Sequence, residues 1–440
     1  MPSHPCANPM ILAIDLGSSH FKAAVFDRRM AVCGRGSSPV RHQFSSGGRV
    51  ELEVADATEA FRDCVAAALR SASVDTNSLE AIAVTSQAQT FTIVGGDGRA
   101  RMPFISWQDA RAERTCEWLK RDPRLARFGD HSSFGEILPV LTICQIAHLK
   151  QSRPGFLRSD DRIMHLPTYL VRHLTGESVV DSNLAAMCGL YSLPREDWYP
   201  EALEVCGIRP EQLGHLVAIG EVAAHTAGTA AEFGIAAGIP VILAGNDQTA
   251  GAYGARLHES GGLLLTLGTA QVAYVCSTTP APSDPALVRG PYPGNLHYRL
   301  AADGCGGAVV TWAQGVLSGC STDASFFASA DQSEPGCRGL VFDAELPSGA
   351  GTWKRIGLHH TVADFARAVI ESLSCRMADQ IRRLGVDPAG VRVLAAGGGS
   401  RASTWLRIQS ETIGAPITAI DATPLDGAAG MAWAAIDARP

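Results

Sequence analysis

The chain has 440 residues, a formal net charge of −7 and a hydrophobic fraction of 46%. This length exceeds what one compact core organises, so we expect two domains. The mild charge without basic blocks argues against a nucleic-acid partner, and the lack of a long uncharged apolar run argues against a membrane span. The first ten residues do not have the layout of a signal peptide, and the 12 cysteines include no Cys-x-x-Cys pair, so we expect a cytoplasmic protein with reduced thiols.

Short apolar strands alternate with helical patterns along most of the chain. The helix predicted over 56–70 has Asp56 as its N-cap and Glu59 three residues later. Its predicted apolar face consists of Phe61, Cys64, Val65, Ala68 and Leu69. A second helix, predicted over 363–384, repeats apolar residues every four positions. This alternation predicts a largely parallel α/β sheet with some antiparallel hairpins. The predicted strands are 11–15, 21–26, 81–85, 90–94, 240–244, 263–267, 271–275 and 391–396.

Two stretches of the chain share one plan. Residues 11–27 read ILAIDLGSSHFKAAVFD, and residues 261–275 read GGLLLTLGTAQVAYV. Each has a strand, a Gly-Ser or Gly-Thr turn and a second strand. A chance match is the alternative, since strand-Gly-strand is common. Otherwise the repeat predicts two lobes, residues 1–246 and 247–440, whose hairpins face each other across a cleft.

The turns of these hairpins suit phosphate groups. A Gly-Ser or Gly-Thr turn exposes backbone N–H groups and a hydroxyl, and glycine lets the backbone approach a ligand closely. Lys22, on the strand after the first turn, could add a positive charge toward the same anion. The candidate phosphate-binding residues are Gly17, Ser18, Ser19, Lys22, Gly268 and Thr269.

Asp15 stands just before the first turn, at the end of an apolar strand. Beside a phosphate site, its carboxylate is suited to Mg²⁺, directly or through water, because Mg²⁺ in proteins uses one or two carboxylates plus phosphate oxygens. The alternative is an acid that only caps the turn.

Asp247 follows the strand predicted over 240–244, where a helix rich in small residues begins. Ligands gather at the carboxyl ends of strands in α/β folds. We interpret Asp247 as a base that accepts a hydroxyl proton during phosphoryl transfer, for which an ordinary aspartate pKa suffices. The alternative is a helix N-cap.

The stretch 391–405, VRVLAAGGGSRASTW, runs from a strand through three glycines toward a helix and could receive a nucleotide. It also fits G-x-G-x-x-A loosely, with Asp421 about 20 residues on, so an NAD(P)-dependent oxidoreductase is one alternative. The P-loop pattern G-x-x-x-x-G-K-[ST] is absent from the sequence.

Taken in order, these pieces resemble the FGGY family of carbohydrate kinases, a branch of the actin-like ATPases. The resemblance implies two ribonuclease-H-like domains that close over ATP and a sugar or polyol. It also implies the base role for Asp247 and adenosine contacts at Gly397, Gly398, Gly306 and Gly307. The markers are Asp15-Leu16-Gly17-Ser18-Ser19 with Lys22; Trp107-Gln108-Asp109-Ala110-Arg111; Gly245-Asn246-Asp247; Leu267-Gly268-Thr269; and Gly397-Gly398-Gly399 with Trp405.

The sugar side departs from the family pattern. In TSQAQTF, residues 85–91, Ala88 and Gln89 stand where relatives often carry Met-His or Arg-Glu. Trp107 could present its ring to the C–H face of a sugar, or it could be a core tryptophan. Asp109 and Arg111 either contact the sugar or pair with each other. The residues predicted to bind substrate are Gln89, Trp107, Asp109, Asp247 and Gln248.

The resemblance therefore implies an ATP- and Mg²⁺-dependent kinase that phosphorylates a hydroxyl of a ketose or polyol, with pentuloses and heptuloses favoured. The Trp-Gln-Asp-x-Arg run is similar to sedoheptulokinases and xylulokinases without deciding between them. A non-catalytic sugar sensor on a kinase fold is a second alternative, favoured by Ala88-Gln89. The expected partner is a small sugar or polyol, and a homodimer stays open.

Overall fold

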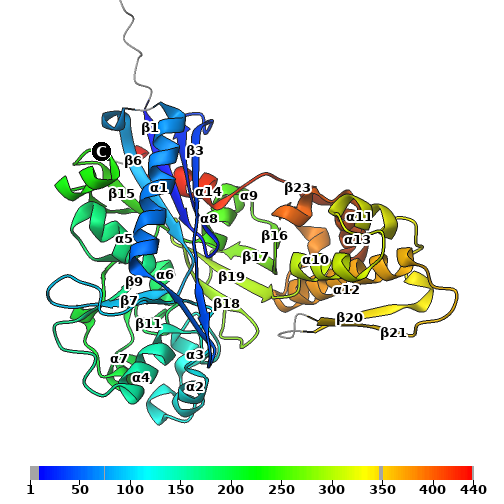
Figure 1. Ribbon diagram of the computed structural model, residues 1–440, viewed down its shortest axis with the longest axis horizontal. Coiled ribbons are helices and arrows are strands. Elements are labelled where there is room, and N and C mark those ends of the chain that lie inside the picture. Colours follow the sequence, from blue (N-terminus) through cyan, green and yellow to red (C-terminus); the bar gives the residue numbers. More distant parts are fainter. Residues whose placement is uncertain (1–8, 74, 346–349, 439–440) are drawn as a thin grey trace, which may run out of the picture.

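The computed structural model describes residues 9–73, 75–345 and 350–438. Figure 1 shows two lobes side by side, each built around a twisted sheet with helices packed on it. The N-terminal half of the chain forms the larger lobe on the left, and most of the C-terminal half forms the lobe on the right.

The first sheet has six strands in the order β14-β15-β6-β1-β2-β3. Strands β1, β2 and β3 are antiparallel neighbours, whereas β6 and β15 run parallel to β1. The carboxyl ends of β1, β6 and β15 therefore lie at one edge of the sheet. The bounds are β1 Met10–Leu16, β2 His20–Asp27, β3 Val32–Pro39, β6 Leu79–Ser86, β14 Val222–His225 and β15 Pro240–Asn246.

The second sheet repeats this plan, with strands in the order β18-β19-β17-β16-β22-β23. Its β16, β17, β19, β22 and β23 correspond in order and direction to β1, β2, β3, β6 and β15. The predicted α/β fold with two like lobes is thus confirmed, and the two predicted hairpins occupy equivalent places. The bounds are β16 Leu263–Leu267, β17 Gln271–Ser277, β18 Val288–Tyr292, β19 Leu296–Asp303, β22 Val393–Ala396 and β23 Ile417–Ala419.

The helices of the first sheet come from both ends of the chain. Helices α1 and α5 pack on one face, and α14, the last helix of the chain, packs on the other face beside α8. The C-terminal segment therefore returns to the first lobe, as the red helix in Figure 1 shows. The division at residues 246 and 247 stays a prediction. The bounds are α1 Val54–Ala72, α5 Leu166–Thr175, α8 Asp247–Gly254 and α14 Pro424–Asp437. Helix α9, Leu257–Ser260, follows α8 and packs against the second sheet.

The predicted start of α1 is wrong. The helix begins at Val54 with Glu53 as N-cap, and Asp56 lies inside the first turn. A carboxylate in the first turn stabilises a helix through the helix dipole. Acidic residues are therefore common both at the N-cap and in the first turn, and the sequence alone did not distinguish the two positions for Asp56. The predicted apolar face is confirmed, since Phe61, Cys64, Val65, Ala68 and Leu69 are all buried.

A second core of the first lobe lies below the six-stranded sheet. A five-stranded sheet, β4-β5-β8-β7-β9, packs there against short helices. The bounds are β4 Gln43–Ser45, β5 Arg49–Leu52, β7 Phe91–Val94, β8 Phe104–Ile105, β9 Arg162–His165, α2 Glu113–Leu119, α3 Phe128–His131, α4 Thr142–Ser152, α6 Ser182–Ala186 and α7 Pro200–Cys206. Two small pairs complete this region, β10 Val179–Asp181 with β13 His215–Val217 and β11 Tyr191–Ser192 with β12 Asp197–Trp198.

The second lobe is organised by α12, which spans Val362–Arg383 and closely matches the predicted helix. Its predicted stripe of Val369, Leu373, Met377 and Ile381 is buried, and Phe365 is partly buried. The other elements of this lobe are α10 Gly307–Val316, α11 Asp323–Ala330, α13 Ser403–Ile413 and the hairpin of β20 Val341–Glu345 and β21 Ala350–Lys354.

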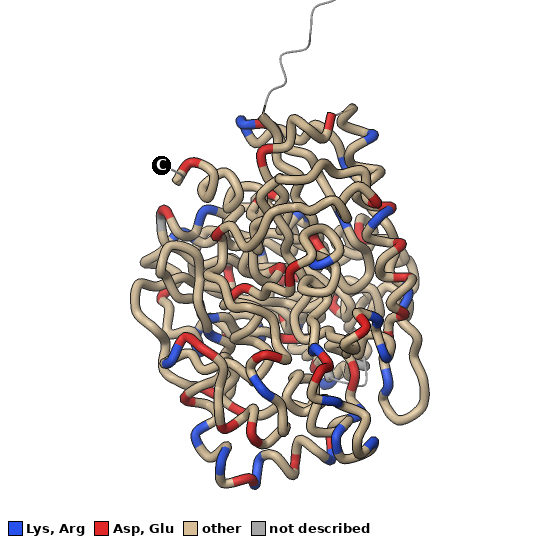
Figure 2. The backbone as a smooth tube through the Cα atoms, turned by 90° about the vertical axis from the view of Figure 1, so that its left-hand side faces the viewer, with Lys and Arg blue, Asp and Glu red and all other residues tan. Residues whose placement is uncertain are grey.

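Charges of both signs are interspersed over the face of the molecule drawn in Figure 2. Among the described residues, none of the helices combines the length and the apolar character that crossing a membrane requires.

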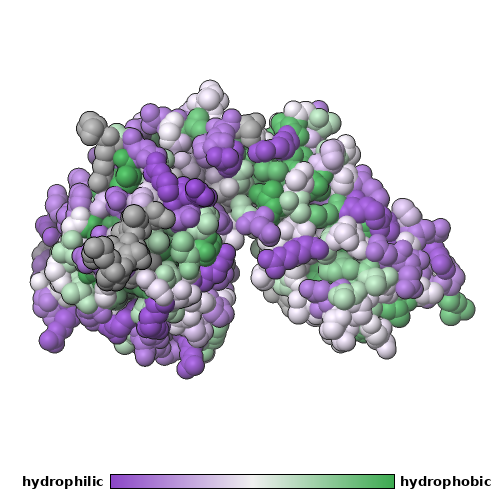
Figure 3. All heavy atoms as spheres, turned by 90° about the horizontal axis from the view of Figure 1, so that it is seen from above, coloured by the Kyte–Doolittle hydropathy of each residue, from purple (hydrophilic) through white to green (hydrophobic). Residues whose placement is uncertain are grey.

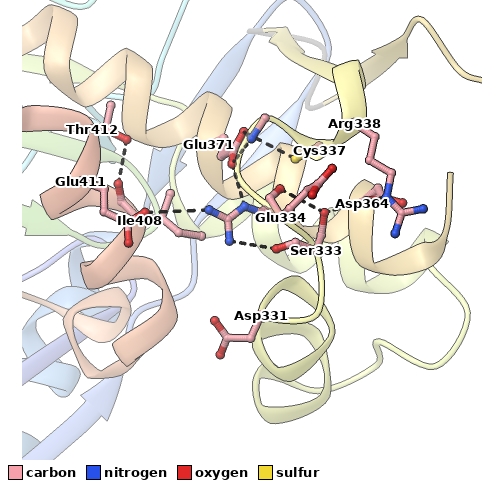
Figure 4. A network of polar contacts seen from close by, with 12 residues as sticks. Asp331, Ser333, Glu334, Cys337, Arg338, Asp364, Glu371, Ile408, Glu411 and Thr412 are labelled. Carbon is pink, nitrogen blue, oxygen red and sulfur yellow. Dashed lines mark hydrogen bonds and ion pairs between the residues drawn. The ribbon is translucent and has the colours of Figure 1, made fainter.

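A network of polar contacts links Glu371 of α12 to the segment that contains Ser333 and Cys337 (Figure 4). A buried arginine of α12 completes this network. Arg367 is 2% exposed. It donates to Glu371 at 2.7 Å and to the carbonyl of Ser333 at 3.2 Å. Glu371 in turn accepts a hydrogen bond from the backbone N–H of Gly336 at 3.0 Å. Removing the guanidinium would take the donor from the Ser333 carbonyl and the positive charge from Glu371, which would keep its bond from Gly336.

We expect Arg367→Met to lower the free energy of unfolding by about 3 kcal/mol, because it breaks a buried ion pair while keeping most of the side-chain volume. Denaturant unfolding followed by circular dichroism measures this change. Arg383→Met is the matched control, since Arg383 is an exposed arginine at the end of the same helix. Equal stability of the two variants would contradict the prediction.

Candidate active site

Three charged side chains meet at the edge of the first sheet that borders the second lobe. Figure 3 shows the deep notch between the lobes. Asp15 on β1 and Lys22 on β2 are direct partners in the antiparallel register. Asp247 is the first residue of α8, directly after β15. It lies close enough to Asp15 to raise the pKa of that carboxyl, so the three groups form one electrostatic cluster.

Asp15 is a buried carboxylate with one oxygen that lacks a hydrogen-bond partner among the described residues. It is 7% exposed, and its Oδ1 has no hydrogen bond within the described chain. Burial raises its pKa to about 7, the charge of Asp247 adds to the rise, and Lys22 opposes it. A buried polar atom without a partner calls for an unobserved one. A divalent cation would satisfy this oxygen and relieve the repulsion between the two acids, so the residues present fit the predicted Mg²⁺.

The N-cap alternative for Asp247 is wrong, because Asn246 caps α8. The Oδ1 of Asn246 accepts the backbone N–H of Thr249 at 2.8 Å. Asp247 uses only Oδ1, which accepts the N–H of Gln248 at 2.8 Å. Burial raises its pKa, which the Gln248 N–H and Lys22 partly offset. The raised pKa, beyond the ordinary value that the sequence argument required, makes this carboxylate a stronger proton acceptor.

The first predicted phosphate turn lies beside this cluster. Gly17, Ser18 and Ser19 connect β1 to β2 and are partly or fully exposed. The carbonyl of Gly17 accepts a hydrogen bond from Nε2 of Gln87 at 3.2 Å, which ties the turn to the end of β6. The hydroxyls and Lys22 are thus presented at the same edge as both aspartates.

The second predicted turn forms one unit with the start of α10. The backbone N–H groups of Gly307 and Ala308 donate to the carbonyls of Gly268 and Thr269, at 2.8 and 3.2 Å. Gly306 allows this approach, since a Cβ there would lie 2.7 to 2.9 Å from backbone atoms of residues 268–270. The glycines predicted from the two separate motifs therefore meet.

Gly397 joins the same unit from the end of β22. It has φ +91°, and a Cβ on it would lie 2.8 Å from the carbonyl oxygen of Leu267. Gly398 is exposed with open space above it. A 3₁₀ helix, Gly398–Arg401, follows this strand, whereas a dinucleotide fingerprint requires the glycines to open an α-helix. Asp421 points to solvent, with a side chain 94% exposed.

We expect Gly306→Ala to raise the KM for ATP about tenfold, because the added methyl group must push the second turn away from α10. The KM for the sugar should change little, since this glycine lies on the second lobe. Gly315→Ala is the matched control: Gly315 is in α10, has open space around it, and alanine is the better helix former. Initial-rate kinetics separate the two, and an unchanged KM for ATP in Gly306→Ala would contradict the prediction.

The predicted sugar side lies near β6 and β7. Gln89 has φ +62°, and its Nε2 donates to the carbonyl of Met187 at 3.2 Å. A non-glycine residue held in this region is strained and often marks a functional site. Trp107 is 39% exposed, so the core alternative is wrong, and its backbone N–H donates to Thr90 Oγ1 at 3.1 Å. Gln248 is partly buried beside Asp247.

Asp109 and Arg111 pair with each other, which was one of the two alternatives. Asp109 is fully buried, and it accepts hydrogen bonds from Arg111 and from the backbone N–H of Val50 at 2.7 Å. Arg111 also donates to Glu51 at 2.7 Å. Because the carboxylate is enclosed and already bonded, we withdraw Asp109 as a substrate contact.

The sequence argument missed Gln87 and Asn246. Gln87 is 6% exposed and joins the carbonyl of Gly17 to the hydroxyl of Thr90, so it connects the predicted phosphate turn to the predicted sugar side. Asn246 is the cap that positions Asp247. The sequence could have identified this cap, because asparagine is a preferred N-cap residue and Asn246 stands directly before the helix.

Comparisons with known proteins agree with this architecture. A curated glycerol kinase of Brucella ovis is 27% identical over 438 residues, covering 92% of this chain and 86% of that protein. An L-fuculokinase of Escherichia coli K12 is 24% identical over 443 residues, covering 96% and 92%. The crystal structure of a xylulose kinase from Rhodospirillum rubrum superposes with a TM-score of 0.88 at 23% identity, covering 98% and 90% of the two chains. That structure, with a TM-score of 0.85 for a Plasmodium falciparum glycerol kinase with ADP, establishes the two-domain actin-like fold.

Residues 10–254, more than half of the chain, match the N-terminal domain of the FGGY family of carbohydrate kinases. The resemblance stated from the sequence is thereby confirmed, and so are the phosphotransferase class with an alcohol acceptor and the use of ATP with Mg²⁺. This assignment favours neither the oxidoreductase nor the non-catalytic alternative. With its duplicated sheet, its paired turns and the acid cluster between them, the chain belongs to the FGGY family of carbohydrate kinases.

Proposed function

We propose that this kinase transfers the γ-phosphoryl group of ATP to a hydroxyl of an uncharged ketose or polyol, with pentuloses and heptuloses favoured. Asp247 accepts the hydroxyl proton. The convergence of Asp15, Lys22 and Asp247 carries this proposal, since it puts a proton acceptor, a cation-binding carboxylate and a positive charge at one edge. The phosphate contacts are Ser18, Ser19, Lys22, Gly268 and Thr269, and the adenosine contacts are Gly306, Gly307, Gly397 and Gly398.

The two oxygens of Asp247 have separate tasks. Oδ1 is held by the N–H of Gln248, which orients the carboxylate. Oδ2 is left to take the proton from the acceptor hydroxyl. Phosphoryl transfer has a loose transition state, so orientation and charge neutralisation matter more than base strength. Lys22, on the neighbouring strand β2, stabilises the negative charge of the transferred phosphoryl group.

Asp15 would hold Mg²⁺, which when bound would neutralise charge on the phosphate oxygens. The lobes close over the reactants, because water in an open cleft would compete with the sugar as acceptor.

The ion pairs of Arg111 favour an uncharged acceptor. Its guanidinium is bonded to Asp109 and Glu51, so it is not available to a sugar carboxylate. The exposed ring of Trp107 offers an apolar face for the C–H groups of a sugar. Similar proteins carry the names L-fuculokinase and xylulose kinase, which supports a ketose, and also glycerol kinase, which keeps polyols in the set.

An ADP-release assay across pentuloses, heptuloses, polyols and gluconate tests the proposal. We expect ADP release with one ketose or polyol, dependent on Mg²⁺, and none with gluconate. ADP release with gluconate alone would overturn the acceptor class. Absence of sugar-dependent ADP release with every acceptor, together with sugar binding by calorimetry, would instead favour the sensor. Nicotinamide absorbance in the same screen tests the oxidoreductase.

A further inference from the structure

Asn183, on α6, is a fully buried side chain whose amide makes four hydrogen bonds. Its Oδ1 accepts the backbone N–H and the Nδ2 of Asn246, at 3.0 and 2.9 Å. Its Nδ2 donates to Thr249 Oγ1 at 3.1 Å and to the carbonyl of Pro291 at 2.9 Å. An asparagine amide has two donor and two acceptor positions, so all of them are used. The orientation of this side chain is therefore defined by its surroundings.

The partners of Asn183 belong to both lobes. Asn246 ends β15 and caps α8, the helix whose first residue is Asp247. Pro291 lies on β18 of the second sheet. Asn183 thus joins the turn that carries the proton acceptor to the lobe that carries the second phosphate turn.

A second hydrogen bond reinforces this link. The hydroxyl of Tyr274, on β17 of the second phosphate hairpin, bonds to Thr249 Oγ1 at 2.9 Å. Thr249 also accepts the Nδ2 of Asn183, so the same hydroxyl group receives contacts from both directions. The start of α8 is consequently held between α6 and the second sheet.

The far end of α6 reaches the sugar side. Met187, which caps α6, accepts the Nε2 of Gln89 through its carbonyl, and its Sδ lies 2.9 Å from Nδ2 of Asn246. At the other end, Asp181 accepts the backbone N–H of Asn183 at 2.9 Å. The backbone of Asn183 is therefore held in place, and the short helix connects three parts of the site.

We propose that Asn183 is a positioning residue, which places Asp247 in register with the phosphate turn of the second lobe. This inference rests on the proposed base role of Asp247. Asn183 touches no reactant; it acts by holding the turn in front of Asp247 against Pro291. A displacement of about 1 Å can cost on the order of 100-fold in rate, so a contact of this kind has a large effect on turnover.

Asn183→Leu has a similar shape and loses all four bonds. We expect its kcat to fall about 100-fold while the KM for the sugar changes by less than about threefold. Tyr274→Phe removes only the link to Thr249 and should lower kcat by about threefold to tenfold. Tyr292→Phe is the matched control, because Tyr292 is buried in the same aromatic cluster and the structure shows no hydrogen bond from its hydroxyl to α8. A kcat for Asn183→Leu equal to that of Tyr292→Phe, at a temperature where both are folded, overturns the proposal.

Asn183→Asp keeps the test valid if the leucine variant does not fold. A protonated aspartic acid at this position can still donate to the carbonyl of Pro291, whereas an ionised carboxylate has no proton to donate and repels that carbonyl oxygen. We expect a kcat that falls with rising pH through an ionisation that the wild-type protein lacks. The neighbouring acids and phenols, Asp181, Asp247, Tyr274 and Tyr298, are present in both proteins, so the pH profile is read as the ratio of the kcat of the variant to that of the wild-type protein. A pH-independent ratio near one overturns the positioning role.

Hydrogen exchange separates this inference from the proposed function. If the wild-type protein releases no ADP with any acceptor, the proposed function fails, and the exchange of the Thr249 amide still tests Asn183. We expect faster exchange at residues 246–249 in Asn183→Asp than in Tyr292→Phe, because the cap and its support are weakened. Identical exchange in these two variants would mean that Asn183 does not hold this turn.

Discussion

Asp247→Asn is expected to lower kcat by about 10²–10⁴-fold while the affinity for ATP stays nearly unchanged. The amide keeps the shape of the side chain and can still be oriented near Gln248, but it cannot take the hydroxyl proton. The KM for ATP should stay close to the wild-type value, because the phosphate turns lie on other segments. Steady-state ADP release and calorimetric binding of a non-hydrolysable ATP analogue measure the two effects.

Asp421→Asn is the control for this substitution. Asp421 is exposed at the end of the stretch that loosely fits a dinucleotide fingerprint, so it would matter for an oxidoreductase and not for a kinase. We expect wild-type kinase activity in this variant. Undiminished turnover in Asp247→Asn would remove Asp247 from the base role.

Asp15→Asn is expected to stabilise the metal-free protein above pH 7 and to abolish Mg²⁺-dependent turnover. The pKa of Asp15 rises from 3.8 to about 7 in the folded protein, chiefly because of burial and then because of Asp247. Between these two values the folded protein keeps a proton that the unfolded chain releases. The contribution of Asp15 to stability is therefore fully present below pH 3.8 and is lost as the pH rises through about 7.

Asparagine carries no charge at any pH, so the variant lacks this loss. We expect a gain on the order of 2–4 kcal/mol over the wild-type protein at pH 8, and no gain near pH 4. Urea unfolding at the two pH values, without nucleotide or Mg²⁺, checks the sign. Asp27→Asn is a useful comparison, because the Asp27 carboxylate accepts the backbone N–H groups of Arg29 and Ala31 in a surface turn. A wild-type protein that is as stable as Asp15→Asn at pH 8 would contradict the argument.

The trade between stability and function at Asp15 has a structural reason. Two carboxylates share one edge with a single lysine, which is unfavourable in the absence of a ligand. The cation and the nucleotide that we propose for this site would compensate for this arrangement. Binding of Mg²⁺ with nucleotide should therefore stabilise the wild-type protein more than Asp15→Asn.

Much of the fold followed from local patterns. The apolar runs around Gly17 and Gly268 predicted both hairpins, because alternating strands and a glycine turn are properties of a few neighbouring residues. The periodic stripe on 363–384 predicted α12 for the same reason. Asp247 was found because it directly follows a strand, and this position can be read from the sequence.

The failures were of a different kind. Asp56 was chosen as a cap from its residue type, although the helix starts earlier at Val54, where packing against the sheet and not a cap side chain decides the boundary. Asp109 was taken for a sugar contact, although its burial and its bond to Val50 depend on a strand pairing far along the chain. Residue type alone predicts neither, because tertiary contacts choose among acceptable local alternatives.

By itself, then, the sequence determined the two hairpins, the strands that lead into the glycine turns, and the family to which they point, since each depends on short stretches. Only the tertiary structure decided which side chains meet. It brought Asp15 close enough to Asp247 for their charges to interact, and it paired Asp109 with Arg111. It also packed α14 on the first sheet and placed Asn183 in hydrogen-bond contact with the second sheet. Such contacts join residues far apart in the chain, and their partners are selected by the packing of whole elements.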